Sequence, residues 1–264
     1  MEERILTIAA GAPELEFSGE RIVPGKVPDA LFREHEARYV FAGQFVAGKD
    51  VLDLACGTGI GTSYLVTAGA RSCTGLDIAK GAIAYATAAY PSCTFAESDA
   101  TSIRLPDNSI DVVVSFETIE HITDQRKFLL ECRRVLRPGG LLVCSTPNRA
   151  ISRWWAKNPF HVRELGVSEF RQVVQVFFAD VRLYAQKPTF YLPHIAQILA
   201  VGLLDHVGLK EAVKKIVGWK PSPTGLRREF GETHPASEHG IRRYRWGLLK
   251  QPAYLIAVAR KTHQ

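Results

Sequence analysis

Residues 51–65 read VLDLACGTGIGTSYL, and this stretch decides the fold of the chain. The apolar run at its start predicts a short buried strand. Glycines then follow at alternate positions, Gly57, Gly59 and Gly61, and a helical pattern begins at Ser63. Strand, glycine loop and helix in this order build a nucleotide pocket at the carboxyl edge of a parallel sheet. Because glycine has no Cβ, the backbone can approach a ligand closely, and the free N–H groups of the first helical turn can meet a carboxylate or phosphate.

The spacing of the glycines distinguishes two kinds of ligand. A dinucleotide fingerprint is G-x-G-x-x-G, whereas this loop is G-x-G-x-G and has an acid, Asp53, inside the preceding strand. A carboxylate at that position suits a cationic ligand. A second acid, Asp77, ends the predicted strand 72–77, about 20 residues beyond the loop, where a carboxylate can accept both hydroxyls of a ribose.

Together with later segments, this stretch resembles motif I of class I S-adenosylmethionine-dependent methyltransferases. ESDA at 97–100 resembles their adenine-binding segment, SFETIEH at 115–121 their fourth-strand exit, and VLRPGG at 135–140 the turn before their fifth strand. The loop at 19–25 and the helix containing EHEARY at 34–39 are similar to a segment that folds over the cofactor in such enzymes. A plain N-terminal cap on the sheet is the alternative for that segment. The resemblance spans residues 19–184.

The resemblance implies S-adenosylmethionine as the cofactor. Asp77 would then hold the ribose, and Asp99 would accept from the exocyclic amine of the adenine. The cofactor-binding residues that it implies are Asp53, Ala55, Gly57, Thr58, Gly59, Asp77, Ile78, Asp99, Ala100, Phe116 and Tyr39.

Strand and helix patterns alternate after the glycine loop, which predicts a parallel sheet with helices on both faces. We expect an α/β, Rossmann-like fold with a seven-stranded, mostly parallel sheet, an antiparallel last strand, and an α-helical insertion or lid between the last two strands. The expected organisation is an N-terminal cap segment at 1–46 with a helix capped by Asp29, a cofactor-binding core at 47–186, the insertion at 187–244, and the final strand of the core at 245–264.

The insertion is long for a connection inside a domain, and such connections usually have a function. Its helical run at 194–219 and the basic loop after it suggest a lid over the substrate. Packing on the sheet edge, or on a second subunit in a homodimer, is the alternative, and contact of the helix with a membrane surface is a further one. Trp154 and Trp155 lie in a polar loop, so one of them is expected to form a wall of the substrate site.

Methyl transfer from a sulfonium is an in-line displacement in which the protein aligns the nucleophile and manages one proton. An aliphatic hydroxyl gives up that proton with difficulty, so a base or a metal ion is needed. If a helical turn follows the fourth strand, Glu117, Glu120 and His121 stand at positions i, i+3 and i+4 and share a face. His161 could join them from a later loop.

This set resembles the E-x-x-E-H plus distal histidine arrangement of small-RNA 3′-terminal 2′-O-methyltransferases and polyprenyl-quinone O-methyltransferases. In those groups a divalent cation contacts the substrate hydroxyl. The resemblance implies Glu117, Glu120, His121 and His161 as ligands of magnesium, manganese or zinc, and His121, Glu117 and His161 as catalytic residues. The alternative is a metal-free site in which His121 acts alone as a base or only lines the pocket, and Glu120 is an exposed helical residue.

Composition sets few further limits. The chain has 264 residues, 46% hydrophobic and 23% charged, and its net charge of +6 permits an anionic partner without requiring one. Its five cysteines show no metal-binding or disulfide spacing, so we expect buried, reduced thiols in a cytoplasmic protein. No stretch reaches the ~20 apolar residues of a membrane span, and the first residues lack the basic region of a secretion signal.

The favoured interpretation is a small-molecule O-methyltransferase that acts on a hydroxyl of a sugar, glycoside or related natural product, with no nucleic-acid partner. The alternatives are a quinone or phenol O-methyltransferase at a membrane surface, an RNA ribose 2′-O-methyltransferase, and a non-catalytic cofactor-binding scaffold. The basic residues are scattered rather than arranged in a stripe, which argues against RNA.

Overall fold

The structure is a computed structural model that describes residues 15, 21–23, 25–153, 158–190, 241–244 and 250–262. Its centre is one mixed sheet with the strand order β3-β2-β1-β4-β5-β8-β6-β7. The strands are β1 Asp50–Leu54, β2 Ser72–Asp77, β3 Thr94–Glu97, β4 Ile110–Ser115, β5 Leu136–Pro147, β6 Ala179–Phe190, β7 Arg242–Arg243 and β8 Lys250–Arg260. The helices are α1 Asp29–Gly43, α2 Ile60–Thr67, α3 Lys80–Ala89, α4 Gln125–Val135, α5 Arg149–Ser152, α6 Val167–Gln175 and the 3-10 turn η1 Ile119–His121.

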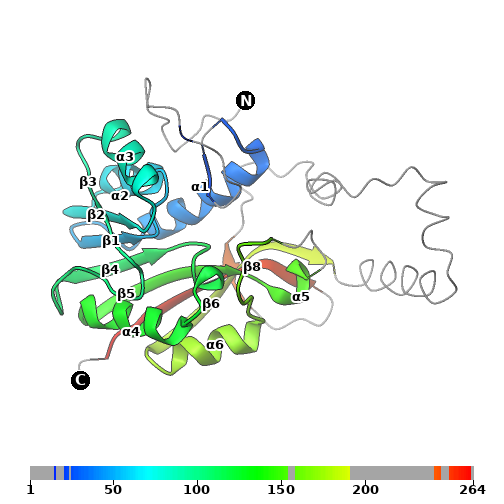
Figure 1. Cartoon of the computed structure of the whole chain (residues 1–264). Helices are drawn as coiled ribbons and strands as arrows, with labels where there is room; N and C mark the ends of the chain where they lie inside the picture. Colours follow the sequence, from blue (N-terminus) through cyan, green and yellow to red (C-terminus); the bar gives the residue numbers. More distant parts are fainter. Residues whose placement is uncertain are drawn as a thin grey trace, which may run out of the picture.

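Strands β1 to β5 run parallel, and β8 lies antiparallel between β5 and β6. Helices α1, α2 and α3 lie on one side of the sheet and α4 and α6 on the other (Figure 1). The predicted Rossmann-like α/β class and the antiparallel last strand are confirmed. The count of seven strands is wrong because the described sheet has eight, the extra one being the two-residue β7 inside the expected insertion.

Alternation along β1 explains how the two faces are filled. Val51 packs into the apolar cluster under α1 and α2, whereas Leu52 and Leu54 pack into the cluster under α4 and α6. Successive side chains of a strand point to opposite faces, so Asp53 shares the face of Val51. Asp53, the buried acid of β1, therefore points toward α1 and α2.

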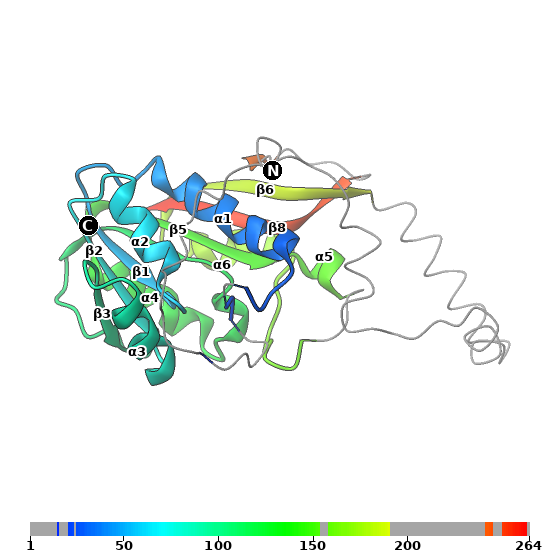
Figure 2. The ribbon, with the colours of Figure 1, turned by 90° about the horizontal axis from the view of Figure 1, so that it is seen from above.

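Helix α1 lies across the sheet above β8 and β6, as the view from above shows (Figure 2). It begins after Pro28, so Asp29 belongs to its first turn. The prediction that Asp29 caps this helix is therefore wrong. Proline at the helix entrance suits the start because its φ is already close to the helical value. The helix ends at Gly43, three residues before the expected end of the N-terminal cap segment.

The expected insertion lies mostly outside the described residues, including the helical run at 194–219 and the basic loop. Strand β6 extends to Phe190, so the first residues assigned to the insertion continue the sheet. Trp154 and Trp155 also lie outside the described residues. Among the described helices, none has the length and hydropathy that crossing a membrane requires.

Candidate active site

The glycines of the loop after β1 serve different purposes. A Cβ on Gly57, which has φ +55°, would meet nothing within 4 Å, so this glycine faces open space. A Cβ on Gly59, with φ +77°, would lie 2.7 Å from side-chain atoms of Ala86 and Phe95, and one on Gly61 would lie 1.9 Å from the ring of Tyr39. Gly59 and Gly61 therefore permit close packing of α3, β3 and α1, and only Gly57 leaves backbone open to a ligand.

Asp53 is fully buried on the face of β1 that points toward α1 and α2. The hydroxyl of Tyr39 donates to its Oδ1 at 3.1 Å, and the hydroxyl of Thr62 donates to its Oδ2 at 2.7 Å. Burial raises the pKa of Asp53 to about 7, although both hydrogen bonds act in the opposite direction. Tyr39 in turn packs edge-on against Phe116, with ring centroids 5.1 Å apart. The carboxylate expected at the amino end of the cofactor is thus covered by a tyrosine from α1.

Asp77 is held at the end of β2 by two backbone donors. The N–H of Gly57 donates to Oδ2 at 2.9 Å, and the N–H of Ala79 donates to Oδ1 at 2.8 Å. These bonds place the carboxylate beside the glycine loop, as expected for a ribose-binding acid. Ile78, next in sequence, is 65% exposed, which is unusual for isoleucine and leaves an apolar surface at this edge.

The remaining expected cofactor residues differ in accessibility. Asp99 is exposed, and its Oδ1 accepts from the backbone N–H of Thr101 at 2.7 Å. Ala100 is only 8% exposed and belongs to the core on the α4 side. Thr58 is buried, with its hydroxyl 3.4 Å from the carbonyl oxygen of Ile22. Ala55 adopts φ +63° at the start of the loop, a conformation that residues other than glycine rarely adopt.

The exit of β4 does not form the helical turn that the sequence suggested. Glu117 has φ +51°, so the chain makes a left-handed step before the 3-10 turn η1 begins at Ile119. The prediction that Glu117, Glu120 and His121 share one helical face is therefore wrong. The carboxylate of Glu117 instead accepts from the hydroxyl of Ser145 at 2.7 Å, at the end of β5.

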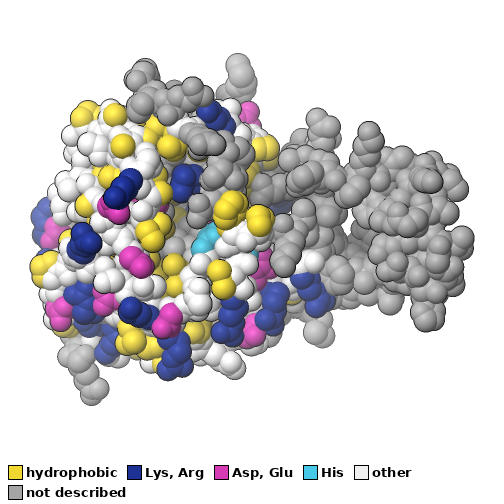
Figure 3. All heavy atoms as spheres, in the orientation of Figure 1, with side chains coloured by type: hydrophobic (Ala, Val, Ile, Leu, Met, Phe, Trp, Pro, Cys, Tyr) yellow, Lys and Arg dark blue, Asp and Glu magenta, His cyan; other side chains and the backbone are white. Residues whose placement is uncertain are grey.

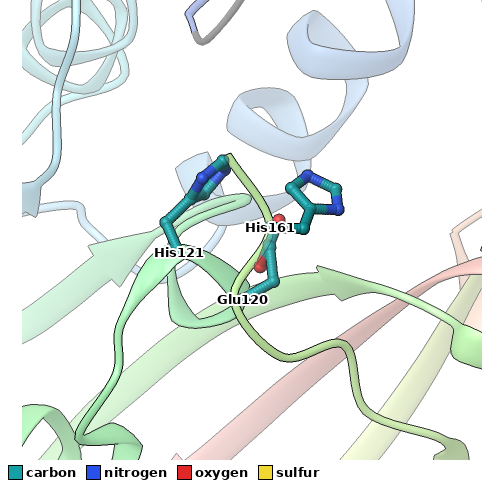
Figure 4. Close-up of side chains that lie close together, drawn as sticks. All are labelled: Glu120, His121 and His161. Carbon is teal, nitrogen blue, oxygen red and sulfur yellow. The ribbon is translucent and has the colours of Figure 1, made fainter. Parts of the chain in front are cut away.

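Glu120, His121 and His161 nevertheless meet. One potential ligand atom from each lies within 4.8 Å of the others, and the two imidazole centroids are 4.8 Å apart. Both rings project to the same side of the turn, with the Glu120 carboxylate between and below them (Figure 4). The loop that carries His161 is fixed to η1 because the N–H groups of Val162 and Arg163 donate to the carbonyl oxygen of Glu120 at 2.8 and 3.0 Å.

Glu120 is fully buried, which overturns the alternative that it is an exposed helical residue. Its Oε2 accepts from the hydroxyl of Thr146 at 3.0 Å, but its Oε1 has no hydrogen-bond partner. Burial and then the charge of Glu117 raise the pKa of Glu120 well above its ordinary value, while the charge of Arg38 acts in the opposite direction. Arg38 is also fully buried, bonded to Gln186 at 2.7 Å.

The donor set fits a divalent cation of borderline hardness. One carboxylate and two imidazoles are ligands that zinc and manganese accept. The unpartnered Oε1 of Glu120 is a buried oxygen that a cation would satisfy. Ligands of one ion at ~2.1 Å can stand at most ~4.2 Å apart, so atoms separated by up to 4.8 Å would have to close slightly. Glu117 does not belong to this group of converging atoms.

Several residues that shape the site are not among the site residues predicted from the sequence. They are Thr62 and Thr146, which bond the two buried acids, Arg38 from α1, and Asn158 and Glu164, which bond His161. Glu164 stands three residues after His161 in NPFHVREL, a spacing that could have indicated a local pair. Asn158 stands three residues before His161 in the same segment, whereas Thr62, Thr146 and Arg38 reach the site through the packing of segments further apart in the sequence.

A histidine side chain reaches the surface on the face of the molecule shown in Figure 3, and apolar side chains lie near it. Two of the exposed large apolar residues, Phe160 at 37% and Val162 at 58%, flank His161 in sequence. Because their backbone is bonded to η1 and their side chains are exposed, they form an apolar rim beside the two histidines.

Residues 52–144 match a family model described as a methyltransferase domain. A protein of Mycolicibacterium smegmatis named "Probable S-adenosylmethionine-dependent methyltransferase" is 41% identical over 165 residues, which are 61% of this chain and 64% of that protein. A phthiotriol/phenolphthiotriol dimycocerosates methyltransferase of Mycobacterium tuberculosis is 36% identical over 135 residues, 49% of this chain and 47% of that protein. The chain thus spans less than two thirds of the length of these relatives.

Solved structures share the fold at low identity. An S-adenosylmethionine-dependent methyltransferase from Thermotoga maritima superposes with a TM-score of 0.58 at 14% identity, covering 89% of this chain and 94% of its own. The cyclase SpnF superposes with a TM-score of 0.56 at 19% identity, covering 87% and 82%. Since a cyclase adopts the same fold, the fold by itself does not define the reaction.

Proposed function

We propose that this chain, which carries a methyltransferase domain of the S-adenosylmethionine-dependent class, transfers the methyl group of S-adenosylmethionine to a hydroxyl of a small molecule, such as a sugar or glycoside. The observation that carries the choice of oxygen is the convergence of Glu120, His121 and His161 beside the edge that holds Asp77. An aliphatic hydroxyl needs a base or a Lewis acid, and this group supplies the residues for either.

The cofactor half of the proposal is supported by the carboxyl edge of β1 and β2. Asp77 can accept from ribose hydroxyls while the Gly57 and Ala79 N–H groups hold it in place. Gly57 offers open backbone beside it, and exposed Ile78 can cover one face of the adenine. S-adenosylmethionine, when bound, supplies a methyl group already activated by its positive sulfur.

The acceptor half rests on His121. Its Nδ1 lies 3.0 Å from the carbonyl oxygen of Phe160, and because a carbonyl only accepts, Nδ1 carries the proton. Nε2 then holds the lone pair and can take the proton of an acceptor hydroxyl as the methyl group arrives. The other route uses a divalent cation: if Glu120, His121 and His161 held one, the lone pair of His121 would be a ligand instead of the base, and the cation would polarise the hydroxyl and lower its pKa.

The name of the Mycobacterium tuberculosis relative supports oxygen as the accepting atom, since a triol is an alcohol. The deciding experiment supplies the protein with S-adenosylmethionine labelled in the methyl group and a panel of hydroxylated acceptors: free sugars, glycosides, phenols and quinols. We expect label on oxygen in a sugar or glycoside. Label on nitrogen or carbon only, or transfer to none of the panel, would contradict the proposal.

Three further measurements distinguish the competing activities: liposome flotation, RNA binding and turnover by the isolated chain. Quinone or phenol methylation at a membrane surface predicts flotation with liposomes. RNA ribose methylation predicts salt-dependent binding of RNA, whereas acidic side chains intersperse the basic ones on the face shown in Figure 3. A non-catalytic scaffold predicts that the isolated chain turns over no acceptor at all.

A further inference from the structure

The side chain of Asn158 reveals which nitrogen of His161 carries the proton. The backbone N–H of Phe160 donates to Asn158 Oδ1 at 3.0 Å, so the amide Nδ2 must be the atom that faces His161. That Nδ2 lies 3.0 Å from His161 Nε2. Because an amide N–H can only donate, Nε2 must be the acceptor, and the neutral imidazole therefore carries its proton on Nδ1.

The carboxylate of Glu164 lies on the opposite side of the same ring. Its Oε1 is 2.5 Å from His161 Nδ1, and its Oε2 accepts from the hydroxyl of Ser152. A carboxylate can only accept, so this contact requires the proton on Nδ1, just as the contact with Asn158 does.

His121 is held in the same tautomer by the same loop, through the carbonyl oxygen of Phe160. Both imidazoles thus keep the lone pair on Nε2, and both are fixed from the segment 158–164. Pairing of an imidazole N–H with a carboxylate is the arrangement that commonly orients histidine ligands of metal ions and makes the other nitrogen a better donor.

We propose that Glu164 is a positioning residue of the site: it accepts the Nδ1 proton of His161 and so keeps Nε2 as the nitrogen that engages a cation or an acceptor hydroxyl. The role rests on the proposed function, since it concerns the same histidine, but the tautomer itself can be measured without cofactor, cation or acceptor. Asn158, the present partner of Nε2, would give way to the bound group.

A purely structural role would be different. Glu164 also connects the loop to α5 through Ser152, and loss of that connection alone would lower the melting temperature without changing the imidazole. Glu169 offers a matched control in the neighbouring helix. Its carboxylate accepts from the N–H of Gly166 at 2.9 Å and pairs with Arg149 at 2.8 Å, and these contacts do not include His161.

The test uses the full chain labelled with 15N in histidine and compares Glu164→Leu, Glu164→Gln and Glu169→Leu. Two-bond nitrogen–proton couplings identify the tautomer of His161 in the protein without added metal, and Mn2+ binding is followed by electron paramagnetic resonance. We expect the Nδ1–H tautomer in the wild type, a mixture of tautomers in Glu164→Leu, and Mn2+ binding weakened about 10- to 100-fold in that variant. Glu164→Gln should retain the tautomer, because its amide oxygen still accepts from Nδ1–H.

The Glu169→Leu control should keep the wild-type tautomer and Mn2+ affinity even if it melts earlier. A proton on Nε2 of His161 in the wild type would overturn the proposal. So would an unchanged single tautomer in a folded Glu164→Leu protein. If the wild type binds no Mn2+ but shows the expected tautomers, cation use by the site fails while the role of Glu164 stands, so the two claims are decided separately.

Discussion

The hydroxyl of Tyr39 donates to Asp53 across 3.1 Å, and this bond joins the N-terminal helix to the acid of the glycine-loop strand. The other donor to Asp53 is also a neutral hydroxyl, from Thr62 at 2.7 Å. A buried carboxylate bonded only by neutral groups in this way is costly to ionise. Arrival of a cationic cofactor beside it would supply the charge that these hydroxyls do not.

The first prediction concerns the stability of the cofactor-free protein. The pKa of Asp53 is about 7 in the folded protein, and its ordinary value, which applies to the unfolded chain, is near 3.8. Between these two pH values the folded state therefore binds a proton that the unfolded state does not. Stability therefore falls as pH rises from about 4 to about 7, by up to about 4 kcal/mol from this group. Asp53→Asn should match the wild type near pH 4 and melt at a higher temperature than the wild type at pH 8. A variant that is equally destabilised at both pH values would contradict the prediction.

The second prediction separates two glycines of the same loop. Gly61→Ala drives a methyl group into the Tyr39 ring, so we expect a large fall in melting temperature. In Gly57→Ala the added Cβ meets no atom, but the residue must keep φ +55°, so the change should cost only about 1 kcal/mol of stability. Because this Cβ enters the space left open to a ligand, we expect weaker binding of S-adenosylhomocysteine. Thermal melts and calorimetry on both variants give the comparison.

Tyr39→Ala provides the control for Gly61→Ala. Once the ring is removed, the added methyl group has space, so the double variant should be little worse than Tyr39→Ala alone. Additive losses would show that Gly61 is required for a reason other than the tyrosine.

Much of this architecture could be predicted because strong local patterns specify it. The glycine loop with Asp53 and Asp77 indicated the fold and the cofactor edge, and the alternation of strand and helix patterns after it indicated the parallel sheet. The purpose of each glycine could not be predicted, because Gly59 and Gly61 accommodate residues of α1, α3 and β3 that are remote in sequence.

The arrangement of Glu117, Glu120 and His121 was harder to predict, because it too depends on contacts between residues that are remote in sequence. Residue spacing suggested one helical face for Glu117, Glu120 and His121, but the left-handed backbone at Glu117 breaks that face. The burial of Glu120 arises from the packing of η1 against β5 and α4, which no local pattern reports.

The third prediction concerns divalent cations. Mn2+ should bind the wild type, and His121→Ala, His161→Ala and Glu120→Gln should each weaken it by at least about 10-fold, because each removes one of the converging donors. Asp99→Asn, a change of an exposed carboxylate outside this group, serves as the control and should leave Mn2+ affinity unchanged. Equal affinities in all five proteins would place the cation elsewhere.

The fourth prediction concerns the opposite edge of the sheet. Arg137 pairs with Asp50 at 3.0 Å and with Asp111 at 2.9 Å, at the amino ends of β5, β1 and β4. Hydrogen bonds from Arg71 lower the pKa of Asp50, so the network stabilises the fold above the ordinary pKa near 3.8, and this contribution is lost as pH falls further. Arg137→Met should lower the melting temperature by at most about 4 °C at pH 7, and less at high salt or pH 3.

Binding of S-adenosylhomocysteine should not change in Arg137→Met, because the network lies at the edge away from Asp77. A loss of cofactor affinity without a loss of stability would contradict this assignment of the two edges.

The most direct test of the central claim, that methyl transfer occurs beside His121 and His161, measures two quantities on His121→Ala and His161→Ala. Calorimetry gives the affinity for S-adenosylhomocysteine, and labelled methyl donor gives the rate of transfer to the best hydroxylated acceptor. If that claim is correct, the affinity stays within about threefold of the wild type and the transfer rate falls by at least about 100-fold. Undiminished transfer to oxygen in both variants would contradict it.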